Sequence, residues 1–422
     1  MKRQGIWNIY WQRALPAFMG LMPFLSVVVA YGEAAAQEPL RNETVISRSR
    51  PEVDPLGIRM GGFLFFPQLG LAASYDDNVY AFATSEIDDT IYLVQPEFAL
   101  RSNWNNHALN FVAGAEAGYY DENDSEDYVY TFVGSDLRLD VSRDSHLTAA
   151  LKFSKLHEGR DSPNDEDGIE PTEYSLLAAD AGYANDFGLI SFGISGKLDR
   201  YDYDDVGAIN NDDRDHDAWQ GTLRLGVDVN PNFELFVRGT YYRVAYEDEV
   251  DDSGFDRDSA GYEAVLGVAF DLTGVTFGEL FAGYRAQDPD DPLFDSIEEA
   301  QFGGAVTWNP SGLTTIRGQV VRDVRETTQI DTPGYLATEA DLTIDHELLR
   351  SLILGANVGY EKRAYENITR DDTRVDAGLY AKYLMNRHLY VSLNYSYADL
   401  RSDIPAEEFT KNVVMLRLQT QY

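Results

Sequence analysis

The sequence predicts an all-β fold: a transmembrane antiparallel β-barrel of the outer-membrane type, with about eighteen strands, short periplasmic turns and long acidic extracellular loops. Three observations lead to this prediction. Runs of about a dozen residues alternate between apolar and polar side chains, as in strands that face two different environments. The connections between these runs are alternately short and long. A leader-like apolar segment at the N-terminus indicates export.

The composition excludes several classes of protein. The 422 residues carry 71 Asp and Glu against 34 Lys and Arg, a formal net charge of −37, and no cysteine. A chain without cysteine has no disulfide, Cys-ligated zinc, iron–sulfur cluster or thiol nucleophile. The acid excess argues against a nucleic-acid partner, because binding phosphates needs a basic surface. Beyond the leader no apolar stretch is long enough for a membrane helix, so any membrane role must come from strands.

The N-terminus predicts a signal peptide over residues 1–36. Basic residues precede the apolar run 14–31, and the small residues Ala34 and Ala36 that follow form a cleavage site. The alternative is an uncleaved anchor helix, although two prolines interrupt the run. We therefore expect export across the inner membrane, removal of the signal and residence in the outer membrane.

Two regions follow the signal. Residues 37–62 carry three prolines and mixed charges without a sustained period, which predicts a periplasmic N-terminal arm. Residues 63–422 show the alternating runs and form the predicted barrel; residues 107–120, 219–229 and 389–397 are clear examples.

The connections set the strand number. Eight short ones are rich in turn-forming residues, and lie at 103–106, 143–145, 185–188, 230–232, 272–274, 309–312, 346–350 and 386–388. Nine longer, acidic ones lie near 76–89, 121–127, 157–173, 202–217, 247–259, 286–298, 326–337, 363–372 and 399–411. Eight plus nine connections join eighteen strands, and an even number places both barrel ends in the periplasm. The last strand ends on Tyr422, which resembles the C-terminal signal that the barrel-assembly machinery recognises.

Tyrosines cluster where the runs meet the long connections. They are Tyr75, Tyr119, Tyr120, Tyr128, Tyr130, Tyr174, Tyr201, Tyr203, Tyr241, Tyr242, Tyr246 and Tyr284. An amphipathic ring suits a membrane interface, so the one-sided placement predicts an outer aromatic girdle. The alternative is the general preference of tyrosine for strands.

The acidic side chains of four loops allow two interpretations. Residues 157–173, 202–217, 247–258 and 286–298 hold 26 acidic side chains against Arg160, Arg214 and Arg257. The acids either keep the loop surface solvated or bind divalent cations, including ions that bridge anionic lipopolysaccharide. No loop matches a specific site, so we predict no cofactor apart from this loop-bound Ca²⁺ or Mg²⁺.

The polar face of the runs supplies the candidate lumen residues. They are Glu116, Arg138, Lys152, Lys197, Arg224, Glu234, Arg238, Tyr242, Glu279, Arg285, Arg317, Lys382, Tyr390, Asn394 and Arg417. A hydrated, charged wall fits a conduit for a polar solute or polymer, because barrels of this size enclose a lumen wide enough for water. Alternatively the charges pair across neighbouring strands and only rigidify the wall. The sequence leaves both open.

Catalysis has little support. The six histidines are scattered, and neither a metal-binding histidine motif nor a nucleophile elbow is present. We therefore predict that the chain is not an enzyme.

Three motifs carry a family resemblance. Arg50-Pro-Glu-Val-Asp-Pro-Leu-Gly-Ile-Arg59, Phe63-Leu-Phe-Phe-Pro67 and Tyr75-Asp-Asp-Asn-Val-Tyr80 resemble the start of the barrel in the putative beta-barrel porin 2 family. Its members are predicted outer-membrane proteins, often associated with exopolysaccharide synthesis or export. The resemblance implies the fold and location, but carries over no residue-level role.

The resulting expectation is a porin-like conduit for export of an extracellular polysaccharide. The alternatives are a general or nutrient-uptake porin and a structural or adhesive barrel that acts through its acidic loops. The partners that we expect are outer-membrane lipid, lipopolysaccharide, the barrel-assembly machinery and polysaccharide-export components, with no nucleic acid.

Overall fold

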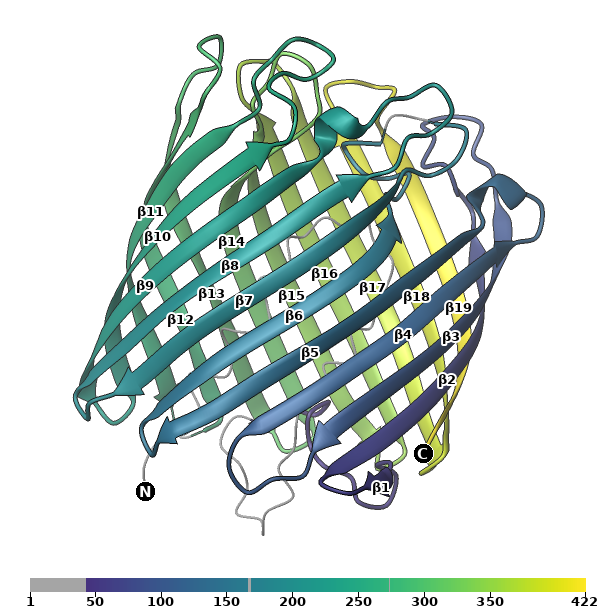
Figure 1. Cartoon of the computed structure of the whole chain (residues 1–422). Helices are drawn as coiled ribbons and strands as arrows, with labels where there is room; N and C mark the ends of the chain where they lie inside the picture. The colour runs from purple at the N-terminus through teal and green to yellow at the C-terminus, as the bar shows by residue number, and fades with distance from the viewer. Residues whose placement is uncertain (1–42, 166–167, 273) are drawn as a thin grey trace.

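The computed structural model describes residues 43–165, 168–272 and 274–422. Within these residues the chain is a wall of long strands joined by loops (Figure 1). The strands are β1 (Ile58–Met60), β2 (Phe63–Asp76), β3 (Asp89–Ser102), β4 (Ala108–Tyr120), β5 (Tyr128–Ser142), β6 (Ser145–His157), β7 (Glu173–Asp186), β8 (Ile190–Tyr203), β9 (His216–Asn230), β10 (Phe233–Tyr246), β11 (Ser259–Leu272), β12 (Thr276–Pro289), β13 (Ile297–Ser311), β14 (Thr314–Arg325), β15 (Tyr335–Leu349), β16 (Leu352–Tyr365), β17 (Asp371–Asn386), β18 (Leu389–Ser402) and β19 (Phe409–Gln421). Two single-turn 3₁₀ helices, η2 (Asp124–Glu126) and η3 (Asp212–Arg214), lie in loops.

Strands β2 to β19 form one closed antiparallel barrel. Each strand pairs with its neighbours in sequence, and β19 pairs with β2 from Val413↔Asp76 to Gln421↔Gln68. The predicted eighteen-stranded barrel is therefore confirmed. Closure satisfies the backbone hydrogen bonds of the first and last strands, which would otherwise be open edges.

The short strand β1 completes the wall where β19 ends. It pairs with the start of β2, from Ile58↔Phe65 to Met60↔Phe63. Ile58 and Met60 are exposed, and they share the outward face with Phe63 and Phe65 because paired residues lie on the same side of a sheet. Strand pairing thus begins five residues before β2.

The two kinds of connection lie at opposite ends of the barrel. Figure 1 shows the short turns at the lower end and the long loops at the upper end. We call these the short-turn end and the long-loop end. Within the described residues no helix is long and apolar enough to cross a membrane.

The outward face of the strands is apolar. On β10, Leu235 and Val237 are exposed, whereas Glu234 and Phe236, which alternate with them, are buried. The same alternation runs through β9, where Leu223 and Leu225 are exposed and Arg224 is buried. Exposed apolar side chains around a closed sheet are what lipid contact requires.

Close strand packing requires glycine at Gly283 on β12. A Cβ there would lie 2.0 Å from the backbone oxygen of Ala264 on β11, closer than any real contact. The neighbouring backbone cannot give way without loss of strand pairing. By contrast, a Cβ at Gly318 on β14 would meet nothing within 4 Å.

We therefore expect Gly283→Ala to destabilise the barrel by about 1–3 kcal/mol, the usual cost of overpacking. The heat-induced mobility shift of the folded barrel in gels should occur at a lower temperature in G283A than in the wild type. Gly318→Ala is the matched control and should shift at the wild-type temperature. Equal transition temperatures for G283A and the wild type would contradict this reading of the packing.

Candidate functional site

The enclosed face of the barrel wall holds the residues that the sequence nominated. Each occupies a strand position that alternates with exposed, lipid-facing residues: Glu116, Arg138, Lys152, Lys197, Arg224, Glu234, Arg238, Tyr242, Glu279, Arg285, Arg317, Lys382, Tyr390, Asn394 and Arg417. The tertiary structure thus brings them onto one surface, around the lumen. Their part in carrying a solute stays a prediction.

Many of these charges form ion pairs with one another or with nearby wall residues. The Nη1 of Arg224 lies 2.8 Å from the Oε1 of Glu234, and Arg238 pairs with Glu263 at 3.1 Å and with Glu279 at 3.9 Å. Cross-strand pairing, one of the two readings of the sequence, is therefore present. Paired charges still leave a polar wall, so pairing does not exclude a conduit.

Aromatic rings hold several of the same cations. The guanidinium of Arg224 lies 4.1 Å from the ring centre of Phe236, and that of Arg285 lies 4.3 Å from the ring of Tyr242. The Lys382 ammonium lies 4.0 Å from the ring of Tyr390. Cation–π contacts of this kind fix the orientation of long side chains.

The first half of the loop between β6 and β7, residues 158–165, enters the lumen and reaches the opposite wall. Its Asp161 pairs with Arg374 on β17 at 2.7 Å, and Oδ1 of Asn164 accepts a hydrogen bond of 2.8 Å from Thr327, in the loop between β14 and β15. In a ring of eighteen strands, β6 and β15 are 15 − 6 = 9 steps apart, which is half the circumference. We call this segment the crossing loop.

Ion pairs also fix the crossing loop at its base. Glu158 pairs with Arg214 in the β8–β9 loop at 2.7 Å, and Arg160 pairs with Glu126 in the β4–β5 loop at 2.8 Å. All four side chains are almost completely buried. Removing one member of such a pair leaves a buried charge without compensation, which typically costs about 3–5 kcal/mol.

The loop between β14 and β15, residues 326–334, is held from the other side. Arg257 in the β10–β11 loop donates hydrogen bonds to the carbonyl oxygens of Thr327, Gln329 and Thr332. It also pairs with Asp251 at 2.7 Å. The few basic residues of the acidic loops are therefore not solvated. Each is buried and bonded to a neighbouring loop: Arg160, Arg214 and Arg257.

The tyrosines divide between the two faces of the wall, which makes the predicted girdle wrong for most of them. Tyr75, Tyr119, Tyr241 and Tyr284 are exposed on the outward face. The other tyrosines nominated for the girdle are on the enclosed side: Tyr120, Tyr128, Tyr130, Tyr174, Tyr201, Tyr203, Tyr242 and Tyr246. Successive residues of a strand point to opposite faces, so the doublets Tyr119–Tyr120 and Tyr241–Tyr242 cannot both face lipid.

The inward tyrosines pack on two histidines. His157 packs against both Tyr128 and Tyr130, with each ring centre 4.8 Å away, and the two tyrosine rings lie 4.5 Å from each other. His216 stacks on Tyr201 at 4.6 Å and on Tyr246 at 4.9 Å. These stacks support the base of the crossing loop, which begins directly after His157.

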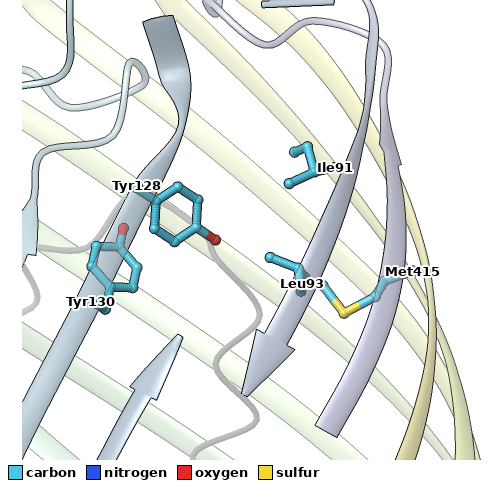
Figure 2. Close-up of a cluster of buried hydrophobic side chains, with 5 residues drawn as sticks. All are labelled: Ile91, Leu93, Tyr128, Tyr130 and Met415. Carbon is cyan, nitrogen blue, oxygen red and sulfur yellow. The ribbon is translucent and has the colours of Figure 1, made fainter. Parts of the chain in front are cut away.

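An apolar patch lies on the same inner wall. Ile91 and Leu93 on β3, Tyr128 and Tyr130 on β5 and Met415 on β19 form one buried cluster, and Figure 2 shows Leu93 and Tyr128 pointing towards each other. Gly118 on the intervening strand pairs with both Leu93 and Tyr128. A Cβ at Gly118 would lie 2.3 Å from the Tyr128 ring, so glycine makes room for that ring.

A cavity of about 390 Å³ lies between this patch and a charged wall. The apolar and aromatic side contributes Ile91, Leu93, Tyr120, Tyr174 and Met415, and the crossing loop contributes residues 158–163. The charged side is formed by β14 to β17, and contains Arg325, Glu339, Asp341, Glu361, Arg363, Arg374 and Asp376. The volume is in the usual range for small-molecule sites.

The arm crosses part of the short-turn end. Val45 is fully buried, and its backbone N–H donates a 2.8 Å hydrogen bond to Thr315 on β14. Arg50 pairs with Glu347 on β15 at 3.0 Å. Farther along, Arg387 and Gln421 donate hydrogen bonds to the carbonyl oxygens of arm residues 51 and 53. The arm is therefore attached to the ends of several strands.

Some predictions fall outside this picture. The signal peptide, with Ala34 and Ala36, and the start of the arm lie outside the described residues. Tyr422 is exposed, and its ring stacks on His388 at 5.4 Å; its role in insertion stays a prediction. In the described part of the chain no group of three or more His, Asp or Glu side chains is arranged to hold a metal ion.

Comparison with known proteins decides the family. Residues 50–422 match the family described as Putative beta-barrel porin 2. The chain belongs to this family. It is accordingly a porin-type barrel of the outer membrane, a class of channel rather than of enzyme, as the sequence predicted.

Solved barrels are similar only at low identity. Pseudomonas aeruginosa OpdK, crystallised with vanillate, shares 11% identity over 85% of this chain and 99% of that chain, with a TM-score of 0.44. P. aeruginosa OpdL shares 11% identity over 86% of this chain and 99% of that chain, with a TM-score of 0.44. The siderophore receptor PirA from Acinetobacter baumannii shares 7% identity over 85% of this chain and 80% of that chain, with a TM-score of 0.47. None of the curated proteins matches the chain.

The sequence reasoning missed the crossing loop, the inner apolar patch and the attachment of the arm. A signal for the patch was present: Ile91, Tyr92, Leu93 and Val94 are consecutive apolar residues, and such a run places apolar side chains on both faces of a strand. A single arginine in three of the four acidic loops was a weaker signal for a buried ion pair. No local pattern could show which opposite strand Asp161 reaches.

We expect Asp161→Asn to widen the pore. Arg374 and Lys411 outweigh the burial of Asp161 and hold the pKa of its carboxyl below the ordinary value, so the pair with Arg374 is ionised at neutral pH. Losing that charge should weaken the attachment of the crossing loop by about 3 kcal/mol, and raise the single-channel conductance in a planar bilayer.

Asp248→Asn is the matched control, because Asp248 is an exposed acid in the β10–β11 loop. It removes one negative charge at the same end without touching the crossing loop. If D161N and D248N showed the same conductance as the wild type, Asp161 would not restrict the pore.

The attachment of residues 326–334 should weaken as pH rises. Burial raises the pKa of Glu326 to about 7, although hydrogen bonds from Ser259 and Tyr246 and the charge of Arg257 oppose the rise. The pKa of this carboxyl is higher when the loop is packed than when the loop is released, so the protonated form stabilises packing. This stabilisation is fully present at acidic pH and is lost as pH rises through about 7.

Hydrogen exchange in residues 326–334, corrected for the intrinsic effect of pH, should therefore be slower at pH 6 than at pH 8. Glu326→Gln keeps a hydrogen-bond acceptor without a titrating group, and should remove this difference. The same pH difference in E326Q would assign the effect to another group.

Proposed function

We propose that this barrel is a conduit through which an extracellular polysaccharide crosses the outer membrane. The observation that carries the proposal is the cavity in the lumen, with an apolar, tyrosine-rich side and a charged side opposite it. A sugar ring has C–H groups on its faces and hydroxyl groups around its edge, so it can use both sides at once. The association of the family with exopolysaccharide synthesis or export also supports this function.

The mature protein in this proposal begins after Ala36 and is inserted by the barrel-assembly machinery, which reads the C-terminal strand ending at Tyr422. The arm, attached at the short-turn end, would face the periplasm, where export components would deliver the polymer. Lipopolysaccharide would surround the acidic loops at the other end.

Uptake of a small nutrient is the second candidate function. It is favoured by the crossing loop, because this segment narrows the passage: Glu158 and Arg160 fix it at its base, and Asp161 and Asn164 fix it to the opposite wall. A polymer would have to pass beside this loop as an extended chain or displace it. A small polar solute would need neither. An adhesive barrel, the third alternative, would depend on the outer loops alone.

The deciding experiment is single-channel recording of the purified barrel in a planar bilayer. For the proposed conduit we expect steady ionic conductance that the extracellular polysaccharide of the source bacterium blocks when it is added. Arg238→Ala removes a charged donor from the lumen wall outside the cavity, and should weaken the block roughly tenfold, the loss expected for one charged hydrogen-bonding partner. Deleting the gene should reduce secreted polymer.

Other outcomes separate the alternatives. Conductance that no saccharide blocks, together with slower uptake of a small solute after deletion, would replace the proposal with the nutrient porin. A barrel that never conducts, and whose loss leaves polymer secretion unchanged, would leave the adhesive role.

A further inference from the structure

The cavity beside the crossing loop has a charge pattern that selects among saccharides. Resting on the proposed function as a saccharide conduit, we propose that this cavity binds uncharged sugar units and rejects units that carry a carboxylate or phosphate. The cargo would then be a neutral glycan rather than an anionic one. The inference depends on the sign of the lining charges, on how they are already paired and on the approach to the cavity.

The lining carries an excess of negative charge. Five cationic side chains line it: Arg160, Arg325, Arg363, Arg374 and Lys411. Seven carboxylates face them: Asp76, Glu158, Asp161, Glu339, Asp341, Glu361 and Asp376. The difference is 5 − 7 = −2, so an anionic sugar entering the cavity meets like charge. Like charges brought together in a site of low dielectric strongly disfavour the wrong ligand.

Every cation of the lining already has an anionic partner. Arg325 pairs with Glu339 and Glu361, and Lys411 pairs with Asp76. The remaining three cations are also paired: Arg363 with Glu361, Arg374 with Asp161 and Asp376, and Arg160 with Glu126 and Asp165. A sugar carboxylate could gain a cation only by displacing one of these buried partners, which would leave that partner uncompensated.

A neutral sugar makes no such demand. Its hydroxyl groups can donate to the carboxylate oxygens, which accept several hydrogen bonds each even when one is used in an ion pair. Asp341 is suited to this role, because its side chain is exposed in the lumen and lines the cavity. The C–H faces of the sugar would lie against Leu93 and Met415 on the other side.

The route to the cavity favours the same cargo. The four most acidic loops carry 26 acidic residues, and their three arginines, Arg160, Arg214 and Arg257, are buried in ion pairs. The surface of the long-loop end is therefore strongly negative, and it repels a polyanion over about a Debye length. A neutral polymer feels no such barrier in either direction.

The test compares two probes of equal length on the intact barrel in a planar bilayer. One is a neutral glucose oligomer and the other is a glucuronic-acid oligomer. We expect the neutral oligomer to block the current with at least roughly tenfold higher affinity than the acidic one. Measurements at about 0.15 M and 1 M salt separate the exposed loops from the cavity, because salt screens exposed charges far more than buried ones. Most of the discrimination should persist at high salt.

Two variants place the effect in the cavity. Asp341→Asn removes one lining carboxylate and should narrow the discrimination several-fold, because the block by the glucuronic-acid oligomer strengthens while the neutral oligomer loses one charged acceptor. Asn357→Phe adds bulk to the lining without charge and should weaken the neutral block. Asp248→Asn, on the outer loop surface, is the control and should change neither at high salt. The heat-induced mobility shift confirms that each variant is folded.

The outcomes distinguish this inference from the proposed function. Equal or stronger block by the glucuronic-acid oligomer overturns the inference, and so does discrimination that D341N leaves unchanged. Block by the bacterium's own polysaccharide but not by the neutral oligomer keeps the conduit and removes the neutral-sugar assignment. If neither oligomer nor that polysaccharide blocks a conducting barrel, the conduit and the inference fail together.

Discussion

Closure of the sheet between β2 and β19 is the constraint on which the rest of the structure depends. A strand in lipid has no water to satisfy its backbone N–H and C=O groups, so every strand needs two neighbours. The pairing from Val413↔Asp76 to Gln421↔Gln68 supplies the last neighbour. It also fixes which face of each strand is enclosed, because closure turns one side of the alternation inward. The wall charges, the inner tyrosines and the crossing loop all acquire their positions from that closure.

Once the barrel is closed, the charges of its loops decide which segment enters the lumen. An acidic loop surface repels itself, and an inward fold must overcome that repulsion. The crossing loop does so through arginines: Arg160 and Arg214 hold its base, and Arg374 holds Asp161 from the opposite wall. Such pairs are stable because both members are buried together and each one compensates the other. The crossing loop and the loops at the surface are thus similarly acidic. The crossing loop differs because buried arginines pair with its acidic side chains.

The inner wall is less uniformly polar than alternation suggests. Ile91, Leu93 and Met415 line the lumen next to tyrosines, and a ladder of ion pairs from β14 to β17 faces them. Such an asymmetric lumen can contact the two sides of one ligand differently. This asymmetry supports a saccharide as the cargo, and the sign and pairing of the lining charges support a neutral one. An open, evenly charged pore would give no reason to prefer either.

The sequence by itself determined the strand number, the order of pairing, the two ends of the barrel and the face of each nominated wall residue. These properties follow from local rules: a period of two along a strand and the length of each connection. Only the tertiary structure decided that Asp161 reaches Arg374, that Tyr128 and Tyr130 face inward beside Leu93, and that Arg50 attaches the arm to Glu347. These contacts join residues that are far apart in the chain, and their partners are set by barrel circumference and loop path. Neither quantity is written in any short stretch of sequence.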